Sequence, residues 1–196
     1  MDITQKTDEE LIEGVKSGGM DSFRILYDRY KLKIYNYLYH LLESREQAED
    51  CAHDLFIQLF KKASLYSPKA KFSSWLYCMA KILAFDALRK NKTRRARALD
   101  QPVDSSEDSV LLGELLPDPG PGPEKAAESK EIAGMVRESI AKLNEKDKQI
   151  ILLCDMQGLS HQEVSEILGD SINTITVRLY RARRRLAEIL KKEGLL

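Results

Sequence analysis

The chain has 196 residues, with 31 basic and 31 acidic side chains and hence a formal net charge of zero, and 43% of its residues are hydrophobic. This length predicts one or two domains, and the composition is typical of a globular, helix-rich protein. No apolar run approaches the length of a membrane span, and the polar, acidic N-terminus does not resemble a signal peptide. We therefore expect a cytoplasmic protein without membrane insertion. The three scattered cysteines contain no CxxC pair, which argues against a disulfide framework and against a zinc site.

Residues 1–96 show only the periodicity of helices. Apolar residues recur every three or four positions over 23–41 and again over 48–60, so each stretch predicts a helix with one buried face. After a loop rich in Ser, Pro and Lys, Ser73 or Ser74 can cap a third helix. A short helix around residues 9–16 is expected to precede these three. The sequence therefore predicts a small helical bundle.

Residues 97–128 are predicted to be a flexible linker. This range contains all but one of the six prolines of the chain, and its run PDPGPGP cannot lie inside a helix or a central strand. Residues 100–131 hold nine acids and two lysines. Residues 86–97, by contrast, hold six bases and one acid, and residues 176–192 hold seven bases and one acid. Two basic stretches joined by an acidic connector suggest a bipartite binder of a polyanion.

Residues 129–196 are predicted to form a second helical domain that ends in a helix-turn-helix. Ser160 and Glu163 have the spacing of a capping box, so a helix begins there, and Gly169 ends it. Ser171 can cap the next helix. In that helix the residues expected to form the buried stripe recur every three or four positions. They are Ile172, Ile175, Leu179, Ala182, Leu186 and Ile189.

The outward face of this last helix has the order of side chains that a helix in a DNA groove needs. Small polar residues come first and arginines follow, which suits base edges near the helix start and phosphates on either side. The alternatives are a surface helix made soluble by arginine and a basic helix on a membrane surface; the Asn/Thr cluster and the capped partner helix argue against the membrane. The predicted DNA-reading residues are Ser171, Asn173, Thr174, Thr176, Val177, Arg178, Tyr180, Arg181 and Arg184.

Residues 143–190 resemble the C-terminal region of bacterial RNA polymerase sigma factors of the extracytoplasmic-function (ECF) group, in the sigma-70 family. The matching residues are Leu159-Ser160, Glu163-Val164-Ser165, Leu168-Gly169, Thr174-Ile175, Arg178-Leu179 and Arg181-Ala182-Arg183. In the first block, SFRILYDRYKLKIYNYLYHLL is similar to the family's first core-binding helix and AEDCAHDLFIQLF to its clamp-binding helix. FSSWLYCMAKILAFDALRKNKTRR is similar to its promoter-melting and minus-ten segment. Asp170, Asn173 and Thr176-Val177 depart from the family pattern. Asn173 and Thr176-Val177 lie on the exposed first turns of the last helix, so the minus-thirty-five sequence that this chain reads is expected to be unusual.

The resemblance implies a sigma factor that binds the clamp helices and the flap of core RNA polymerase and directs it to promoter DNA. It implies a first domain over 1–96, a linker over 97–128 and a second domain over 129–196, with an anti-sigma factor as the usual control. The implied core-binding residues are Glu49, Asp50, Asp54 and Gln58; a solvated acidic face is the alternative. The implied minus-ten residues are Ser67, Lys69, Lys71, Phe72, Tyr77, Arg89, Lys90, Lys92, Arg94 and Arg95, and Tyr77 is preferred to Trp75 for stacking on a base.

Two other functions fit parts of the sequence. A dimeric helix-turn-helix regulator that acts without polymerase would have a self-association surface. A nucleic-acid enzyme would use Asp50, His53 and Asp54, which share one helical face, as metal ligands. No second carboxylate cluster or phosphate-binding glycine loop accompanies these three residues. We therefore expect no catalysis, no cofactor, no metal and no small-molecule substrate.

Overall fold

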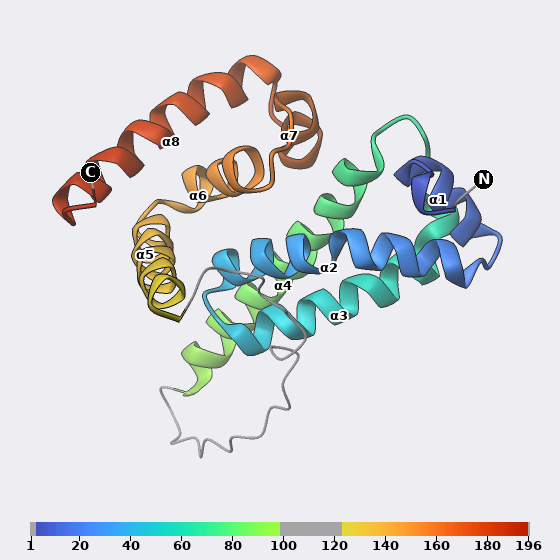
Figure 1. Cartoon of the computed structure of the whole chain (residues 1–196), viewed down its shortest axis with the longest axis horizontal. Coiled ribbons are helices and arrows are strands. Elements are labelled where there is room, and N and C mark those ends of the chain that lie inside the picture. The colour runs from blue at the N-terminus through green and yellow to red at the C-terminus, as the bar shows by residue number, and fades with distance from the viewer. Residues whose placement is uncertain (1–2, 99–122, 196) are drawn as a thin grey trace.

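The computed structural model describes residues 3–98 and 123–195, and every regular element in these two ranges is helical (Figure 1). The first range holds α1 (Asp8–Lys16), α2 (Met20–Leu42), α3 (Arg45–Lys62) and α4 (Phe72–Ala98), with 3₁₀ turns at Ile3–Gln5 and Ala63–Leu65. The second holds α5 (Pro123–Ala141), α6 (Glu145–Ile151), the π-helical turn η3 (Leu152–Met156), α7 (His161–Leu168) and α8 (Ile172–Lys192). The prediction of two all-helical domains with a C-terminal helix-turn-helix is confirmed.

The first domain is built on the apolar faces of α2, α3 and α4. Leu26, Ile34 and Leu38 of α2 and Leu55 and Leu59 of α3 have no exposed surface. Within each helix, successive members are four or eight residues apart, intervals that place side chains on one side of a helix. Burial of each such side chain contributes roughly 1.5–3 kcal/mol. The helical periodicity of the sequence thus produces the core of this domain directly.

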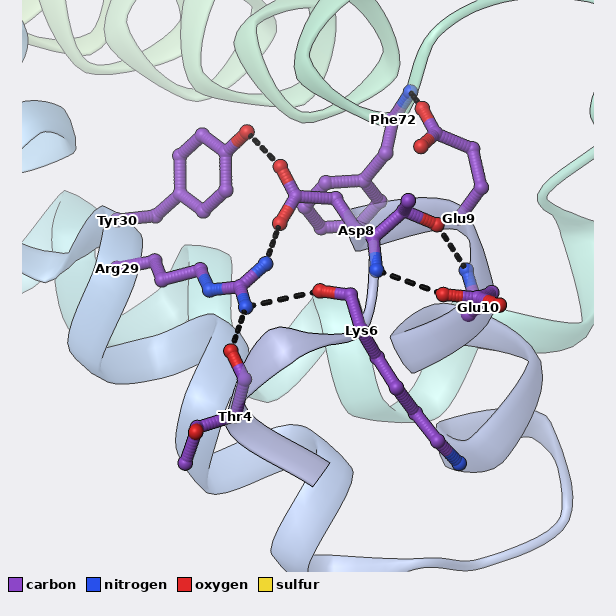
Figure 2. Close-up of polar contacts among 9 residues, drawn as sticks. Thr4, Lys6, Asp8, Glu9, Glu10, Arg29, Tyr30 and Phe72 are labelled. Atoms are coloured by element: carbon purple, nitrogen blue, oxygen red, sulfur yellow. Dashed lines mark hydrogen bonds and ion pairs between the residues drawn. The ribbon is translucent and has the colours of Figure 1, made fainter. Parts of the chain in front are cut away.

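A polar network fixes α1 against α2 and against the start of α4 (Figure 2). The carboxylate of Asp8 accepts hydrogen bonds from Arg29 Nη1 at 2.6 Å and from the Tyr30 hydroxyl at 2.5 Å. The neighbouring Glu9 accepts a hydrogen bond from the backbone N–H of Phe72 at 3.1 Å and so satisfies one of the free donors at the start of α4. Burial, and then the hydrogen bond with Asp8, raise the pKa of Tyr30. The network therefore sets where α4 begins.

The helices extend further into the predicted linker than its composition suggests. Helix α4 continues to Ala98, and α5 begins at Pro123, so both ends of the range 97–128 are helical. Proline is accepted at the first position of a helix because its missing N–H is not needed there. Residues 99–122, which include the PDPGPG sequence, lie outside the described residues.

The second domain has the caps that the sequence predicts. The Ser160 hydroxyl accepts from the N–H of Glu163, and the Glu163 carboxylate accepts from the N–H of Ser160, so α7 begins with a capping box. Gly169 ends α7 at a φ of 77°, in the left-handed region that favours glycine, and Ser171 caps α8 by accepting from the N–H of Thr174. Ile172 was expected in the buried stripe, but it is 44% exposed because it is the first residue of α8 and lies outside the packed turns.

The two domains pack against each other in addition to being joined through the chain. Helix α7 lies against α4, and the end of α2 lies against α5 and η3 (Figure 1). Helix α8 lies on the outer side of the second domain, across α6 and α7. This arrangement leaves α8 accessible and places α7 next to the predicted minus-ten segment.

Candidate nucleic-acid interface

The outer face of α8 gathers the residues that the sequence predicts to read DNA. Val177 is 50% exposed and Tyr180 is 65% exposed, and only Arg178 of the set is half-buried. The helix begins at Ser171, whose hydroxyl accepts from the N–H of Thr174 in the first turn. The exposed members of the predicted set are Ser171, Asn173, Thr174, Thr176, Val177, Tyr180, Arg181 and Arg184.

A groove of about 540 Å³ runs between the first half of α8 and the start of α6. Arginines from α8 form one side, and the residues that cap α6 form the other. The groove combines hydrogen-bond donors with positive charge, which is the composition that a nucleic-acid backbone and base edges require. Its lining residues are Asn144, Lys146, Asp147, Asn173, Thr174, Val177, Arg178, Arg181 and Arg185.

The arginines of α8 divide into those that hold the domain together and those that have no protein partner. Arg183 pairs with Asp155 of η3, with its Nε 3.1 Å from an oxygen of the carboxylate, and Arg185 pairs with the buried Asp147 of α6. Arg181 and Arg184 make no hydrogen bond or ion pair with another residue in the described part of the chain. The predicted set contains Arg181 and Arg184 and omits Arg183 and Arg185, but it also contains Arg178, which pairs with Asp170.

Two further members of the predicted set have partners inside the helix-turn-helix. Arg178 donates to Asp170, in the turn between α7 and α8, at 2.6 Å. The Thr176 hydroxyl donates to the Ile172 carbonyl at 3.0 Å and lies 3.1 Å from Nδ1 of His161 at the start of α7. These contacts orient both side chains before any ligand is present. Sequence reasoning singled out Asp170 as a departure from the family but did not assign it this contact.

The predicted minus-ten residues are split between exposed and buried positions. Ser67, Lys69 and Lys71, in the loop before α4, are exposed, and so are Arg89, Lys90 and Lys92 on α4. The side chains of Arg94 and Arg95 lie outside the described residues. The structure thus presents cations at both ends of α4.

Two aromatic predictions on α4 are corrected by the structure. Phe72 has no exposed surface because it packs against Tyr30, Tyr66 and Trp75, and Tyr77 is only 1% exposed. Trp75, which was expected in the core, is half-buried. The reason is that α4 is covered on two sides: Phe72 faces its own bundle, whereas the Tyr77 hydroxyl donates to Gln157 of the second domain at 2.8 Å. The apolar periodicity of α4 shows which side faces its own bundle, but it does not show that Gln157 of the second domain covers the other side.

The loop before α4 has an internal anchor that sequence reasoning missed. The side chain of Tyr66 is buried, its hydroxyl donates to the Ala70 carbonyl at 2.8 Å, and its ring lies 5.5 Å from that of Trp75. The Lys16 ammonium is 5.3 Å from the centre of the Tyr66 ring. Because the chain on both sides of Ser67 and Lys69 is held in this way, these two side chains are presented at a fixed place. The only available signal was a tyrosine next to Leu65 in a loop rich in Ser, Pro and Lys.

The acidic face of α3 carries exposed carboxylates that are not paired with other described residues, and an exposed apolar side chain lies beside them. Asp50 and Asp54 are exposed and make no hydrogen bond or ion pair with the other described residues. Ile57, which the sequence analysis missed, lies one turn beyond Asp54 on the same side of the helix and is 39% exposed. The other two predicted core-binding residues form hydrogen bonds within α3: Glu49 accepts from Arg45 at 2.9 Å, and Gln58 accepts from Lys62 at 2.8 Å.

The described residues contain no helix long and apolar enough to cross a membrane. Within the same ranges, no group of three or more His, Cys, Asp and Glu side chains is placed to hold a metal ion. Burial raises the pKa of each of the thiols Cys51, Cys78 and Cys154. These thiols are therefore less ionised than a free cysteine at neutral pH.

Comparison with known proteins identifies both domains. Residues 26–94 match the family Sigma-70 region 2, and residues 133–186 match the family Sigma-70, region 4. The chain is 34% identical over 180 residues to the ECF RNA polymerase sigma factor SigW of Bacillus subtilis, covering 92% of this chain and 95% of that protein. It is 30% identical over 179 residues to the ECF RNA polymerase sigma-E factor of Haemophilus influenzae, covering 91% and 93%.

Two solved structures have the same fold. One is CnrH in complex with the cytosolic domain of CnrY, with a TM-score of 0.69 and 19% identity over 95% of this chain and 99% of that one. The other is the sigma factor RpoE in complex with the anti-sigma factor NepR from Bartonella quintana, with a TM-score of 0.66 and 19% identity over 86% and 96%. The two matching regions, in this order, and the identity to SigW over nearly the whole chain show that it belongs to the ECF group of RNA polymerase sigma factors, in the sigma-70 family.

Proposed function

We propose that the chain binds core RNA polymerase and directs it to promoters by holding the minus-thirty-five element with α8 and the minus-ten element with the loop before α4 and with α4 itself. The observation that carries this proposal is the outer face of α8. There, Asn173, Thr174 and Val177 come first, and Arg181 and Arg184 follow, neither of them paired with another described residue. In this proposal the first group reads base edges and the second holds phosphates.

The minus-ten surface has its cations at the two ends of α4. Ser67, Lys69 and Lys71 hold the strand at the loop, and Arg89, Lys90 and Lys92 hold phosphates beyond it. The buried Phe72 gives the loop a fixed base and does not itself stack on DNA. Contacts of this kind release counterions, so binding is expected to weaken steeply as salt rises.

The exposed face of α3 is proposed to bind the polymerase clamp. Asp50 and Asp54 supply free negative charge for a basic partner surface, and Ile57 supplies apolar area that loses water on contact. An apolar centre with a charged rim is typical of protein interfaces. The paired Glu49 and Gln58 are proposed to lie at the rim, where contacts contribute less.

Catalysis remains with the polymerase in this proposal, and the chain acts in the cytoplasm as an initiation factor without cofactor, metal or small-molecule substrate. We also propose control by an anti-sigma protein. The proteins of similar fold support this part, because RpoE was solved with the anti-sigma factor NepR and CnrH with the cytosolic domain of CnrY.

The proposal is tested by run-off transcription with bacterial core polymerase and a pool of promoter fragments. The expected result is a promoter-specific transcript that requires the chain, together with comigration of the chain and core polymerase. A chain that forms dimers and protects an operator without polymerase, and yields no transcript, would instead be a polymerase-independent regulator.

A further inference from the structure

We infer that His161 holds the Thr176 hydroxyl as a hydrogen-bond acceptor, so that α8 selects a base with an amino group, adenine or cytosine, at one position of the minus-thirty-five element. The inference rests on the proposed function, because it requires that the outer face of α8 lies in the major groove of the promoter. It makes His161 a positioning residue for DNA recognition. Two hydrogen bonds of the Thr176 side chain carry it.

Thr176 and His161 meet where α7 and α8 come together. Thr176 lies in the second turn of α8 with its side chain exposed, and His161 is the first residue of α7 and is half-buried. At about 100° per residue, Thr176 and Arg178 project from the two opposite edges of the outward face of α8. Arg178 lines the groove beside α6 and is held by Asp170. Thr176 lies at the other edge, next to α7, and is held by His161.

The Thr176 hydroxyl has one hydrogen to donate and two lone pairs that can accept. Its oxygen lies 3.0 Å from the Ile172 carbonyl oxygen, and since a carbonyl only accepts, this bond uses the single hydrogen. A bond to the carbonyl four residues back is a usual arrangement of threonine in a helix. The Thr176 oxygen also lies 3.1 Å from Nδ1 of His161, so the imidazole donates in this second bond. One lone pair of the hydroxyl remains for a ligand, and no hydrogen does.

A hydroxyl that can only accept distinguishes bases by the donors in the major groove. Adenine presents its N6 amino group there and cytosine its N4 amino group, whereas guanine presents O6 and thymine O4, which only accept. Thr176 can accept from either amino group. Opposite guanine or thymine, two acceptors would face each other without a hydrogen between them, and unpaired polar groups of this kind are costly once water is excluded. We therefore expect adenine or cytosine on the strand that faces Thr176.

Thr174 provides a contrast within the same helix. Its side chain is exposed, and its hydroxyl oxygen lies 2.8 Å from that of Ser171, where either oxygen can be the donor. The Thr174 hydroxyl can therefore offer a base either its hydrogen or a lone pair. It is not expected to distinguish amino groups from carbonyl groups. The two exposed threonines thus differ in what they can read, because only Thr176 has its hydrogen fixed by its partners.

The test is selection of duplexes from a randomised promoter library by the holoenzyme that the chain forms with bacterial core polymerase. In the sequences selected by the parent chain, one position should favour adenine and cytosine over guanine and thymine about three- to tenfold, the effect of one hydrogen bond. Thr176→Val keeps the shape of the side chain without the hydroxyl, and it should abolish the preference at this position. Thr174→Val is the matched control and should leave the preference at this position intact.

Two substitutions of His161 separate positioning of the hydroxyl from other effects of the imidazole. His161→Leu removes the donor and frees the Thr176 hydroxyl, so the preference should fall to less than about twofold. His161→Asn keeps an N–H close to the place of Nδ1 and should retain most of the preference. A histidine that acts only through its bulk or its charge would instead change the affinity for all duplexes alike, and asparagine would not restore the choice at one position.

A change in the DNA alone tests the acceptor directly. Unsubstituted purine in place of adenine at the selected position lacks the N6 amino group. This replacement should weaken binding of the parent holoenzyme about three- to tenfold more than binding of the His161→Leu holoenzyme. The weaker base pair is the same in both measurements and cancels in the comparison.

Each outcome decides a separate part. If the parent holoenzyme selects a motif without an amino preference at any position, or if Thr176→Val retains that preference, reading by Thr176 is overturned. If His161→Leu retains the preference, or if His161→Asn behaves like His161→Leu, positioning by His161 is overturned. Failure of the parent holoenzyme to enrich any sequence would overturn the proposed function itself.

Discussion

Asp170 and Arg178 form an ion pair of 2.6 Å that joins the turn of the helix-turn-helix to the side of α8 that lines the groove. Both side chains are partly shielded from water, so the pair holds the guanidinium in one direction more firmly than a surface pair would. Asp170 is also one of the residues that depart from the family pattern. We therefore propose that the pair contributes to the choice of minus-thirty-five sequence.

Replacement of Asp170 by alanine is expected to separate affinity from specificity. Loss of the Asp170 carboxylate near DNA raises the affinity for any duplex. The Arg178 guanidinium is then no longer held in one direction, and this lowers the preference for the promoter duplex over other duplexes. The ratio of promoter to scrambled-duplex affinity should therefore fall, as fluorescence anisotropy at fixed salt would measure. Asp155→Ala is the matched control, because it frees Arg183, which lies outside the reading set, and should raise both affinities equally. An unchanged ratio in Asp170→Ala would remove Asp170 from specificity.

Arg181 is expected to contribute to binding through phosphate contact alone. Arg181→Ala should weaken promoter and scrambled duplexes alike and reduce the slope of log affinity against log salt by about one. The salt dependence of duplex binding between two potassium chloride concentrations measures this slope. Arg185→Ala is an informative contrast, since it leaves Asp147 buried without its partner and should lower the free energy of unfolding instead.

The free carboxylates of α3 are expected to act in polymerase binding and nowhere else. Asp54→Lys reverses the charge of an exposed residue that is paired with no other residue of 3–98 or 123–195. It should lower affinity for core polymerase about tenfold or more, because like charges then meet in the interface. Affinity for the minus-thirty-five duplex should not change. Surface plasmon resonance with immobilised core polymerase gives the first quantity. Asp28→Lys on α2 is the control, and an equal loss in both variants would show a general charge effect.

The network around Asp8 is expected to stabilise the first domain. Asp8→Ala leaves the Tyr30 hydroxyl and the Arg29 guanidinium without their carboxylate, and the free energy of unfolding should fall by about 1–3 kcal/mol in urea titration. Asp28→Ala, which removes an exposed ion pair with Lys31, should cost about 0.5 kcal/mol or less. Equal effects of the two changes would mean that the partial burial of Asp8 and its two hydrogen bonds add no stability beyond that of a surface ion pair.

Features that depend on neighbours in the sequence could be predicted, and features that depend on the other domain could not. The starts of α7 and α8 follow from the side chains of Ser160 and Ser171, which accept from backbone N–H groups three residues on, and the end of α7 follows from the left-handed conformation of Gly169. In each case the sequence contains the whole interaction. Tyr77 fails this condition, because Gln157 lies eighty positions away in the chain.

The same distinction explains the candidate site. The order of residues on α8 and the omission of Arg183 from the reading set could be predicted, because the buried stripe of the helix fixes which side faces outward. The ion pair of Arg178 with Asp170 and the exposure of Ile57 could not, since both depend on how separate helices meet. Prolines in the range 97–128 indicated a break in structure but not its limits, because Pro123 is compatible with the first turn of α5.

His40 is expected to make the packing of the two domains sensitive to acid. It is half-buried near the end of α2, and its Nδ1 has no hydrogen-bond partner in the described part of the chain. Arg137 of α5 and Lys148 of α6 are the charges from the second domain that act on it, while Glu43 of its own helix end is paired with Lys148. Burial first, and then these two cations, lower the pKa of His40.

A lowered pKa means that the folded chain favours neutral imidazole. The stability that this provides is present above the ordinary histidine pKa of about 6.5 and is lost as the pH falls through the lowered value. The free energy of unfolding in urea should therefore be smaller at pH 5.5 than at pH 7.5, and His40→Gln should lose less of it over this interval than the parent chain. His53→Gln, at an exposed position of α3, should follow the parent chain. If His40→Gln also follows the parent chain, the acid sensitivity lies elsewhere, and Glu163, whose lowered pKa acts at more acidic pH, becomes the residue to replace.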